Sequence, residues 1–560
     1  MSKNWIIRET SRAVQEKLSR ELNVPAIISQ ILVNRGIEDT EKAEHFISAE
    51  MKDLHDPFLL KDMKKAVDRI MLAKEQNDKV LIYGDYDVDG VTSSAILHNI
   101  LKKMGITVSN HIPHRMDDGY GLSHDIGEQA LEDGVNLIIT FDCGITAFDE
   151  VDELNKMGLE IIIIDHHEPS GGRRPDAYAV IDPKQEECAY PFRDLAAVGL
   201  VAKLAQALTG EISGEVLDLT AIGTVADVVP LVDENRIFVK RGLPQIANTT
   251  NKGLKALIEI SKINGKKISP YHVGFVLGPR INAAGRMDSA HTSLNLFLSE
   301  DEKSALSYAR DLDRHNLDRQ KMQKDIVAEA FDIIESQEEF LSHKVIVLSK
   351  EGWHKGVLGI VASKISDKYY KPTIVISVEG GVGTASGRSI EGFHLYNALD
   401  NCSSCLEDFG GHEGAVGLTI MEDNIDSFRA LINEVADKVL EIKKLTPTLF
   451  IDGEIELADL NLSLAEKIQT LEPFGEGNEV PLFCSRNLIV KSNPQILAKE
   501  TLKFWVTDGS VAVSAVGFGM SKFKDIVQIG NRVDLAYQIS IDDWNKAPTI
   551  QLILKDIKSA

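Results

Sequence analysis

The stretch VLIYGDYDVDG, residues 80–90, places three aspartates directly behind a run of four apolar residues. Asp85, Asp87 and Asp89 alternate with single residues, so their carboxylates lie close enough to repel one another. Like charges at such spacing cost free energy unless a proton or a cation lies between them. The stretch therefore predicts a bound metal at the end of a buried strand, and it restricts the chain to folds that can gather further ligands there.

More acidic groups follow other apolar runs. Asp142 ends the run NLIITFD, and Asp165 ends EIIIID. His166 and His167 come directly after Asp165. Apolar strands that alternate with helical segments predict a parallel sheet covered on both faces, in an α/β fold. The carboxyl ends of parallel strands open on one crevice, so these side chains are expected to converge. Asp227, in TVADVVPL, has a similar apolar setting and is a fourth candidate position.

The chemistry of these groups indicates the metal. The set is mostly carboxylate with one or two imidazoles, which favours Mn²⁺ or Mg²⁺ over the thiolate-rich sites of structural zinc. Four or five carboxylates exceed the needs of one ion, so the sequence predicts two ions that share a bridging aspartate. Two ions roughly 3.5–4 Å apart suit in-line hydrolysis of a phosphate ester.

Two other motifs begin in a similar way. An EF-hand calcium loop opens with D-x-D-x-D-G, but its last position requires glutamate and Ile96 stands there. Haloacid-dehalogenase phosphatases also carry alternate aspartates after a strand, and the first of them acts as a nucleophile. Neither alternative explains why acidic groups follow the other strands as well, so we favour the two-metal interpretation.

The bulk composition is that of a globular protein with several domains. The chain has 560 residues, of which 43% are hydrophobic and 26% charged. Its first residues lack the apolar stretch of a signal peptide, and no run of eighteen apolar residues predicts a membrane span. Five cysteines fit a reducing cytoplasm. Cys402 and Cys405 lack the second cysteine pair that would favour a zinc site.

The net charge bears on the choice of partner. The formal charge of −24 at pH 7 argues against a nucleic-acid partner, because most nucleic-acid-binding domains are basic. A nuclease can nevertheless be acidic overall, since metal ions neutralise its carboxylates and a local basic groove holds the strand. Net charge alone therefore does not exclude nuclease function.

Hydrophobic periodicity divides the chain into five parts. The long helix is expected at 303–337, which contains neither glycine nor proline, as one helix or a broken pair. The short strands near the C-terminus predict a small β-barrel. The parts are an N-terminal helical segment (1–75), a parallel α/β domain (76–235), a helical region with the connecting helix (236–340), a second α/β domain (341–442) and the barrel domain (446–560).

At DHH the chain resembles the DHH phosphoesterase superfamily and, within it, the bacterial single-strand-specific exonucleases. The resemblance extends over nearly the whole chain and is strong because of the order of its motifs. These motifs include YGDYDVDGVTSSAIL, IPHRMDDGYGL, TFDCGI, DHH, LGPRINAAGRMDSA, WHKGVLGIVASK, SGRSIEGFHLYNAL, FGGHEGAVG and LEPFGEGNEVPLF. The resemblance implies a DHH domain, a DHHA1-like second domain and a C-terminal OB-fold.

The same resemblance implies a set of metal ligands. One ion is expected on Asp85, Asp87 and Asp142. The second is expected on Asp89, Asp142, His166 and Asp227, with Asp142 as the bridge and as a catalytic residue. His167 is expected to act as a second catalytic group, near the scissile phosphate, where it polarises the phosphate or protonates the leaving oxygen.

Substrate contacts are also implied. The expected phosphate contacts are Arg115, Arg280, Ser386, Arg388 and His412. In the OB-fold, Phe504, Trp505 and Trp544 are candidates for stacking on bases, and a buried position in the barrel core is the competing interpretation. Strand alternation places Phe504 and Trp505 on opposite faces, so at most one of the two is expected to stack.

The resemblance implies a function. The expected activity is 5′→3′ exonucleolytic hydrolysis of single-stranded DNA that releases 5′-mononucleotides, in recombination and repair. The implied partners are single-stranded DNA, a single-strand-binding protein and a RecQ-type helicase. An alternative is a hydrolase of short oligoribonucleotides, cyclic dinucleotides or pyrophosphate. A second alternative is a non-catalytic replication scaffold, which the complete set of candidate ligands disfavours.

Overall fold

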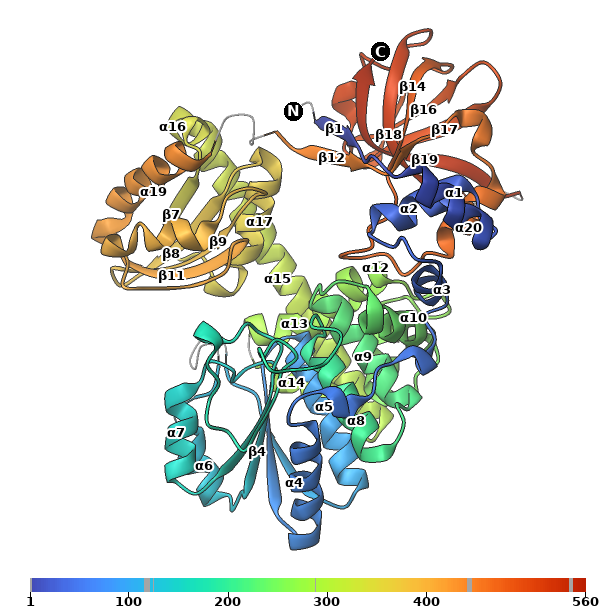
Figure 1. The fold of residues 1–560 in the computed structure, drawn as a ribbon. Helices are drawn as coiled ribbons and strands as arrows, with labels where there is room; N and C mark the ends of the chain where they lie inside the picture. The colour runs from blue at the N-terminus through green and yellow to red at the C-terminus, as the bar shows by residue number, and fades with distance from the viewer. Residues whose placement is uncertain (1–2, 115–120, 124, 288, 441–445, 543–546) are drawn as a thin grey trace.

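Three bodies make up the chain, and the long helix α15 (Glu302–Ser336) links two of them (Figure 1). A parallel α/β body with attached helices lies at one end of α15, and a second α/β body lies at the other. A β-barrel forms the third body. The computed structural model describes residues 3–114, 121–123, 125–287, 289–440, 446–542 and 547–560. None of the described helices combines the length and the apolar composition that crossing a bilayer requires.

The first body contains the predicted parallel sheet. Its strands, in spatial order, are β3 (Thr107–His111), β2 (Lys79–Gly84), β4 (Leu137–Phe141), β5 (Glu160–Ile164) and β6 (Ala179–Ile181). Alternate residues face opposite sides, so Ile82 and Tyr83 belong to different apolar clusters. The two faces are covered by α4 (Met63–Gln76) with α5 (Val88–Lys103), and by α6 (Ile126–Glu132) with α7 (Phe148–Lys156). Both faces are therefore buried, as the apolar strands require.

Helices that follow the sheet extend the same core. They are α8 (Ala197–Thr209), α9 (Gly214–Ala226), α10 (Asp233–Ala247), α11 (Lys252–Ile260), α12 (Pro270–His272), the π-helical turn η4 (Val273–Leu277), α13 (Gly278–Met287) and α14 (His291–Leu298). Their apolar residues join one continuous cluster with the α4 side of the sheet. Helix α9 packs on α5 and ends next to Asp227. This packing carries Asp227 toward the ends of the strands.

Helix α15 is a single helix that serves both α/β bodies. Ala305, Ala309 and Leu312 belong to the core of the first body. Ile326 and Ile334, further along the helix, belong to a cluster with the second body. The helix thus buries a different apolar segment at each end, which explains why most of its other positions are polar. The prediction of a long connecting helix is confirmed.

The second α/β body has a mixed sheet. Its strands, in spatial order, are β10 (Asp408–Gly411), β11 (Ala415–Met421), β9 (Val382–Arg388), β8 (Thr373–Glu379) and β7 (Ile346–Glu351), and only β7 and β8 run parallel. Its helices are α16 (Glu338–Ser342), α17 (Leu358–Tyr369), α18 (Leu395–Asp400) and α19 (Ile425–Val439). Cys402 is buried in this body, and no cysteine joins a metal-capable group among the described residues.

The C-terminal body confirms the predicted β fold. Pairing runs through β14 (Phe483–Val490), β18 (Arg532–Asp542), β19 (Thr549–Ser559), β17 (Ala512–Gly517) and β16 (Thr501–Thr507). Strand β16 pairs again with β14, so the five strands form a closed ring. Two short strands, β13 (Gly453–Glu454) and β15 (Gln495–Leu497), extend the sheet, and α20 (Leu462–Gln469) precedes β14.

The N-terminal segment contacts two bodies. Strand β1 (Asn4–Ile7), in a region expected to be helical, pairs in parallel with β12 (Thr448–Ile451). Helices α1 (Arg12–Glu21), α2 (Ala26–Asn34) and α3 (Thr40–Ser48) bury their apolar faces against the barrel. Helix α4, by contrast, packs on the first sheet. Local periodicity predicts such helices, but it does not predict a strand whose partner lies at the other end of the chain.

One buried arginine joins these parts. Arg236 on α10 is 1% exposed, and its guanidinium lies over the ring of Phe46 at 3.9 Å. Its Nε donates to the carbonyl oxygen of Phe46 at 2.6 Å. Its Nη1 and Nη2 donate to the carbonyl oxygens of Pro473 and Glu472 at 3.2 and 3.0 Å. The side chain of Arg236 therefore links the first body to α3 of the N-terminal segment and to the residues that precede the barrel strand β14.

Replacing Arg236 by Met should destabilise this junction. The change removes the arginine donors from three carbonyl groups, of which that of Pro473 keeps a hydrogen bond from Asn478 Nδ2, and we expect a loss of about 2–4 kcal/mol in the free energy of unfolding. Urea denaturation followed by far-UV circular dichroism measures it. The matched control is Arg12→Met, because the Arg12 side chain is 89% exposed and pairs only with Glu16. Equal unfolding midpoints for the two variants would contradict the assigned role of Arg236.

Candidate metal centre

The loop after β2 is shaped by hydrogen bonds and by glycine. Asp87 accepts hydrogen bonds from the backbone N–H groups of Asp89 and Gly90 at 2.8 and 3.1 Å, and so caps α5. A Cβ on Gly90 would lie 2.4 Å from the carbonyl oxygen of Asp85. Only glycine permits so close a crossing of the backbone. The three aspartates are therefore held at the positive end of a helix, where negative charge is stabilised.

Asp89 has a second attachment. Its Oδ2 and Oδ1 accept hydrogen bonds from the N–H groups of Ala197 and Val198 at 2.8 and 2.7 Å, at the start of α8. The side chain is 1% exposed, and burial together with the charge of Asp87 raises its pKa to about 7. Each carboxylate oxygen keeps a further lone pair after accepting one hydrogen bond. Asp89 is thus fixed in place and still able to act as a ligand.

Asp142 occupies the centre of the site. It follows β4 with a left-handed backbone, φ 60°, which is uncommon for a residue with a side chain. Its Oδ1 lies 3.1 Å from Nε2 of His166, and that nitrogen lies 3.7 Å from Oδ2 of Asp227. Ends of two adjacent strands and the end of α9 therefore meet here, as the sequence predicts.

Three groups of side chains have potential ligand atoms within 4.8 Å of one another. The groups are Asp85, Asp87 and Asp142; Asp142, His166 and His167; and Asp89, His166 and Asp227. Asp142 and His166 each belong to two of these groups of described residues, and Asp142, with its two carboxylate oxygens, is the one suited to be a bridging ligand. The structure thus brings together every residue expected to bind metal.

The electrostatics of the groups favour bound cations. Burial, followed by the charges of Asp87, Asp89 and other neighbouring carboxylates, raises the pKa of Asp142 well above its ordinary value. Burial and the charge of Asp89 raise the pKa of Asp227 to about 9. Burial and the neighbouring His167 lower the pKa of His166 to about 3, so its ring is neutral and offers a lone pair. Carboxylates that repel one another and a neutral imidazole fit a pair of divalent cations such as Mn²⁺ or Mg²⁺.

Asp165 differs from the other aspartates, since it belongs to none of the three groups. Its Oδ1 accepts a hydrogen bond from Nδ1 of His167 at 2.8 Å, and its oxygens also accept backbone N–H donors from Ile145 and His166. Although burial acts to raise it, the bond from His167 and the backbone donors lower the pKa of Asp165 to about 2. Burial acts to lower the pKa of His167, but Asp165 outweighs it and raises that pKa. Asp165 therefore orients His167 and favours its protonated form.

The expected phosphate contacts lie in several places. On β9, Nη1 of Arg388 lies 3.3 Å from Oγ of Ser386. A Cβ on Gly359, in the first turn of α17, would lie 2.9 Å from Nη2 of Arg388 and 3.0 Å from Oγ of Ser386. A guanidinium, a hydroxyl and a helix N-terminus thus gather at one point of the second body. Such a combination suits an anion.

The other expected contacts are not joined to this cluster by any hydrogen bond within the described parts of the chain. Arg280 on α13 donates to Asp313 of α15 at 2.9 Å and to the carbonyl oxygen of Val276 at 2.7 Å. His412 lies in the turn between β10 and β11, where its Nδ1 accepts the N–H of Gly414 at 3.2 Å. Arg115 lies outside the described residues.

The barrel aromatics separate as alternation predicts. Phe504 is 1% exposed and belongs to the barrel core, so it does not stack on bases. Trp505 is 45% exposed on the opposite face. Trp544 lies outside the described residues. Trp505 remains the candidate for base stacking in the described part of the barrel.

An exposed aromatic pair was not expected from the sequence. Tyr271 and Phe275 stack with ring centroids 5.2 Å apart and are 64% and 73% exposed. The turn η4 that carries Phe275 packs against the end of α9, which leads into Asp227. The sequence SPYHVGFVL contains both rings, but periodicity alone does not distinguish exposed aromatics from buried ones. The pair therefore lies on the helical set that also positions Asp227.

Models of known families match three parts of the chain. The N-terminal domain of the DHH family matches residues 79–224, and the DHHA1 domain matches residues 342–438. The RecJ OB domain matches residues 451–556. Together with the metal-capable groups, these matches define a DHH-type phosphoesterase with an added OB-fold.

Known proteins identify the family more closely. The single-stranded-DNA-specific exonuclease RecJ of Bacillus subtilis is 38% identical over 99% of this chain and 70% of its own length. The RecJ of Dickeya dadantii is 32% identical over 96% of both chains. A crystal structure of RecJ from Thermus thermophilus with Mn²⁺ superposes with a TM-score of 0.86 at 27% identity, covering 100% of this chain and 80% of that one. A second Thermus thermophilus structure, with Mg²⁺, gives 0.77 at 25% identity over 100% and 78%. This chain belongs to the RecJ family.

Replacing Asp142 by Asn should weaken metal binding. The amide keeps the volume of the side chain but removes the charge shared by two of the groups, so we expect the affinity for Mn²⁺ to fall by about tenfold or more. Isothermal titration of metal-free protein measures the affinity and the number of ions bound, which we expect to be two. Asp149→Asn, at an exposed position on α7, is the matched control. Unchanged Mn²⁺ affinity in the Asp142 variant would rule out the shared site.

Proposed function

We propose that this protein is a metal-dependent 5′→3′ exonuclease that degrades single-stranded DNA to 5′-mononucleotides, in recombination and repair. The observation that carries the proposal is the set of carboxylates and imidazoles gathered around Asp142. Membership of the RecJ family supports the choice of substrate. The closed barrel and the exposed aromatic side chains support the action on long strands.

The proposal assigns the ligands in two sets. Asp85, Asp87 and Asp142 hold one ion. Asp89, Asp142, His166 and Asp227 hold the other. When bound by these residues, two divalent cations would supply Lewis acidity that activates water and offsets the charge of the phosphate. The capping bonds at α5 and α8 position Asp87 and Asp89 before any ion binds, which reduces the cost of arranging the site.

His167 is proposed to protonate the leaving 3′ oxygen of the released 5′-mononucleotide, while the shortened strand keeps the new 5′-phosphate. Its side chain is 46% exposed, so one face of the ring is open to substrate. The hydrogen bond from Nδ1 to Asp165 fixes the orientation of the ring, and Nε2 is proposed to donate the proton to the leaving oxygen. The raised pKa of His167, caused by Asp165, favours the protonated ring, which suits a general acid.

The polarity of cleavage is proposed to come from recognition of a terminal phosphate. Ser386, Arg388 and the first turn of α17 form the anion-binding cluster described above. Arg115, Arg280 and His412 complete the proposed contacts. A 5′-phosphate bound on the second body places the next phosphodiester at the metals of the first body. A narrow channel between the two bodies then admits a single strand and excludes a duplex.

The partners and the setting belong to the same proposal. A single-strand-binding protein and a RecQ-type helicase are proposed as partners, on the strength of the family resemblance. A DNA substrate places the activity in the cytoplasm. The alternative substrates, short oligoribonucleotides and cyclic dinucleotides, are too small to need contacts with the barrel or with the exposed rings of Tyr271 and Phe275.

A time course on labelled strands tests the activity. With Mn²⁺ or Mg²⁺ and a 40-nucleotide single strand, we expect a 5′ label to appear at once as mononucleotide and a 3′ label to shorten stepwise. Blunt duplex should be degraded at least about tenfold more slowly. Asp142→Ala should abolish turnover, because it removes the shared ligand. Faster hydrolysis of a dinucleotide than of the 40-nucleotide strand, per molecule of enzyme, would favour the alternative activity instead.

The role of Arg388 is tested separately. Replacing Arg388 by Gln removes a charge-assisted contact to phosphate, so kcat/KM on 5′-phosphorylated strands should fall by about tenfold or more. The rate on 5′-hydroxyl strands should change much less. Lys438→Gln, which removes an exposed charge on α19 of the same body, is the control. An equal loss on both kinds of strand end would show that Arg388 does not recognise the terminal phosphate.

A further inference from the structure

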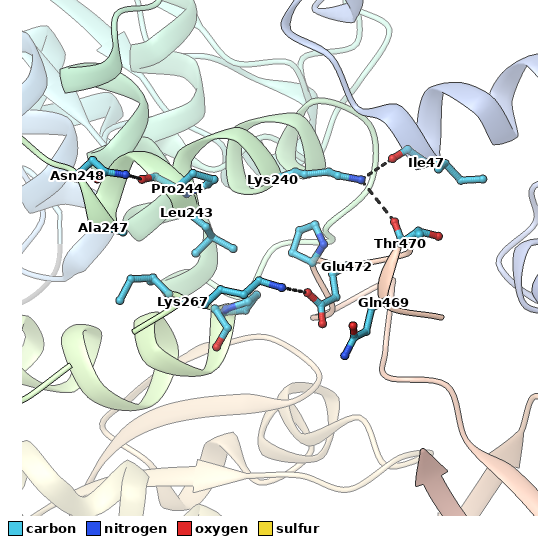
Figure 2. A pocket seen from close by; sticks show the side chains of 14 residues that line it. Ile47, Lys240, Leu243, Pro244, Ala247, Asn248, Lys267, Gln469, Thr470 and Glu472 are labelled. Carbon is cyan, nitrogen blue, oxygen red and sulfur yellow. Dashed lines mark hydrogen bonds and ion pairs between the residues drawn. The ribbon is translucent and has the colours of Figure 1, made fainter. Parts of the chain in front are cut away.

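A cavity of about 840 Å³ lies where three parts of the chain meet, apart from the metal centre (Figure 2). Helix α10 forms one wall, and the segment 267–270 before α12 forms another. The segment 469–473, which leads from α20 to the barrel, and Ile47 of α3 complete the lining. The volume is within the range of small-molecule sites, roughly 300–1,000 Å³. Its size therefore suits a compact ligand.

The walls are largely apolar. Leu243, Pro244 and Ala247 line the α10 side, and Ile268 and Pro270 line the opposite side. Figure 2 shows Leu243 projecting into the space between Lys240 and Lys267. The amide side chains of Asn248 and Gln469 also belong to the lining. Such walls can hold a flat ring while the amides contact its polar edge.

Helix α10 also carries three cations, of which Lys240 lines the cavity. Lys240 donates to the carbonyl oxygens of Ile47 and Thr470 (Figure 2). Arg241 donates to the carbonyl oxygens of Ser48 and Ala49, and Arg236 donates only to carbonyl oxygens as well. The ion pairs of the described residues include none with these three cations, in a chain with a net charge of −24. Carbonyl groups satisfy the N–H donors but do not neutralise the charge.

The effect of this clustering is visible at Lys240. Burial, followed by the neighbouring Arg236 and Arg241, lowers its pKa to about 8. Across the cavity, the side chain of Lys267 is 82% exposed and pairs with Glu472 at 2.9 Å. An anion beside Lys240 would offset the repulsion among the cations on α10. The cavity thus combines apolar walls with one lysine, Lys240, that forms no ion pair among the described residues, beside the ion pair of Lys267 and Glu472.

We propose that this cavity binds a nucleoside monophosphate, with the phosphate at Lys240 and the base against the apolar walls. The inference rests on the proposed function, because that activity would release such molecules from DNA. The ligand has the two features that the lining calls for, a flat apolar ring with polar edges and a compact anion. A lining drawn from several segments around one space suits this shape better than that of an extended strand.

The cavity is connected to the metal centre through the protein chain. The segment 469–473 continues to Glu476, whose carbonyl oxygen accepts the N–H of Leu231 at 2.7 Å. Leu231 lies in the connection between Asp227 and α10. A Cβ on Gly475 would lie 2.6 Å from Cδ1 of Leu231, so the two segments are in close contact. A bound nucleotide therefore braces the segment that supports the loop after Asp227.

Titration calorimetry of the full chain in EDTA, with dTMP as the probe, tests the proposal. EDTA removes the divalent ions, so binding at the metal centre does not contribute. We expect one site. Lys240→Gln should weaken binding by about tenfold or more, because a charge-assisted contact is lost. Ala247→Phe should abolish binding by filling the cavity from an exposed position. Lys255→Gln, an exposed lysine on α11 outside the lining, should bind as the wild type does.

Three results would overturn the inference. The first is an absence of dTMP binding in EDTA. The second is wild-type affinity in both the Lys240→Gln and Ala247→Phe variants, whose folding thermal denaturation verifies. The third is binding of inorganic phosphate as tightly as dTMP, which would mean that the apolar walls play no part. Nuclease activity is measured separately with Mn²⁺. An active nuclease without this site disproves only the inference, and nucleotide binding by an inactive protein disproves only the proposed function.

Discussion

The carboxylates around Asp142 repel one another, and much of the first body can be understood as the means of holding them together. Burial and neighbouring charges raise the pKa values of Asp142 and Asp227, so the charged forms are costly in the absence of cations. The chain supplies part of the compensation itself. Asp87 caps α5, and Asp89 accepts two N–H groups at the start of α8, so two helix N-termini point their dipoles at the cluster. Divalent cations supply the rest, which ties the geometry of the site to metal binding.

The loop that carries these aspartates is also fixed from outside. A Cβ on Gly285 of α13 would lie 2.7 Å from the carbonyl oxygen of Tyr86, between Asp85 and Asp87. The next residue, Arg286, donates from Nη1 to the carbonyl oxygen of Gly356 in the second body. A Cβ on Gly356 would lie 2.3 Å from the carbonyl oxygen of Arg286. Two close backbone contacts thus run from the metal loop through the end of α13 to the second α/β body. A change in the relative position of the bodies cannot leave the metal loop unaffected.

The sequence predicts the strand-end aspartates because periodicity and the rules of parallel sheets place them at one edge. It does not separate the role of Asp165 from that of Asp142, because both follow apolar strands and only the hydrogen bond that Asp165 accepts from His167 distinguishes them. The capping of α8 by Asp89 joins residues 108 positions apart, and no local signal reports it. Alternation predicts that Phe504 and Trp505 face opposite ways, but which one faces the core depends on how the barrel closes. Local sequence patterns also do not predict the pairing of β1 with β12, because the two strands lie far apart in the chain.

The acidic surface helps to explain why such a protein would act at strand ends. Binding along a DNA backbone depends on many lysine and arginine contacts that release counterions. Here many lysines are already paired, for example Lys102 with Glu300 and Lys103 with Glu215, and the net charge is −24. The net charge does not favour binding along interior phosphates. The features proposed to hold a strand are the cluster at Arg388, the metal centre and exposed rings such as Trp505. With a terminal phosphate at the cluster of Arg388 and the next phosphate at the metals, as proposed above, this distribution of charge would favour cleavage from an end over cleavage within the strand.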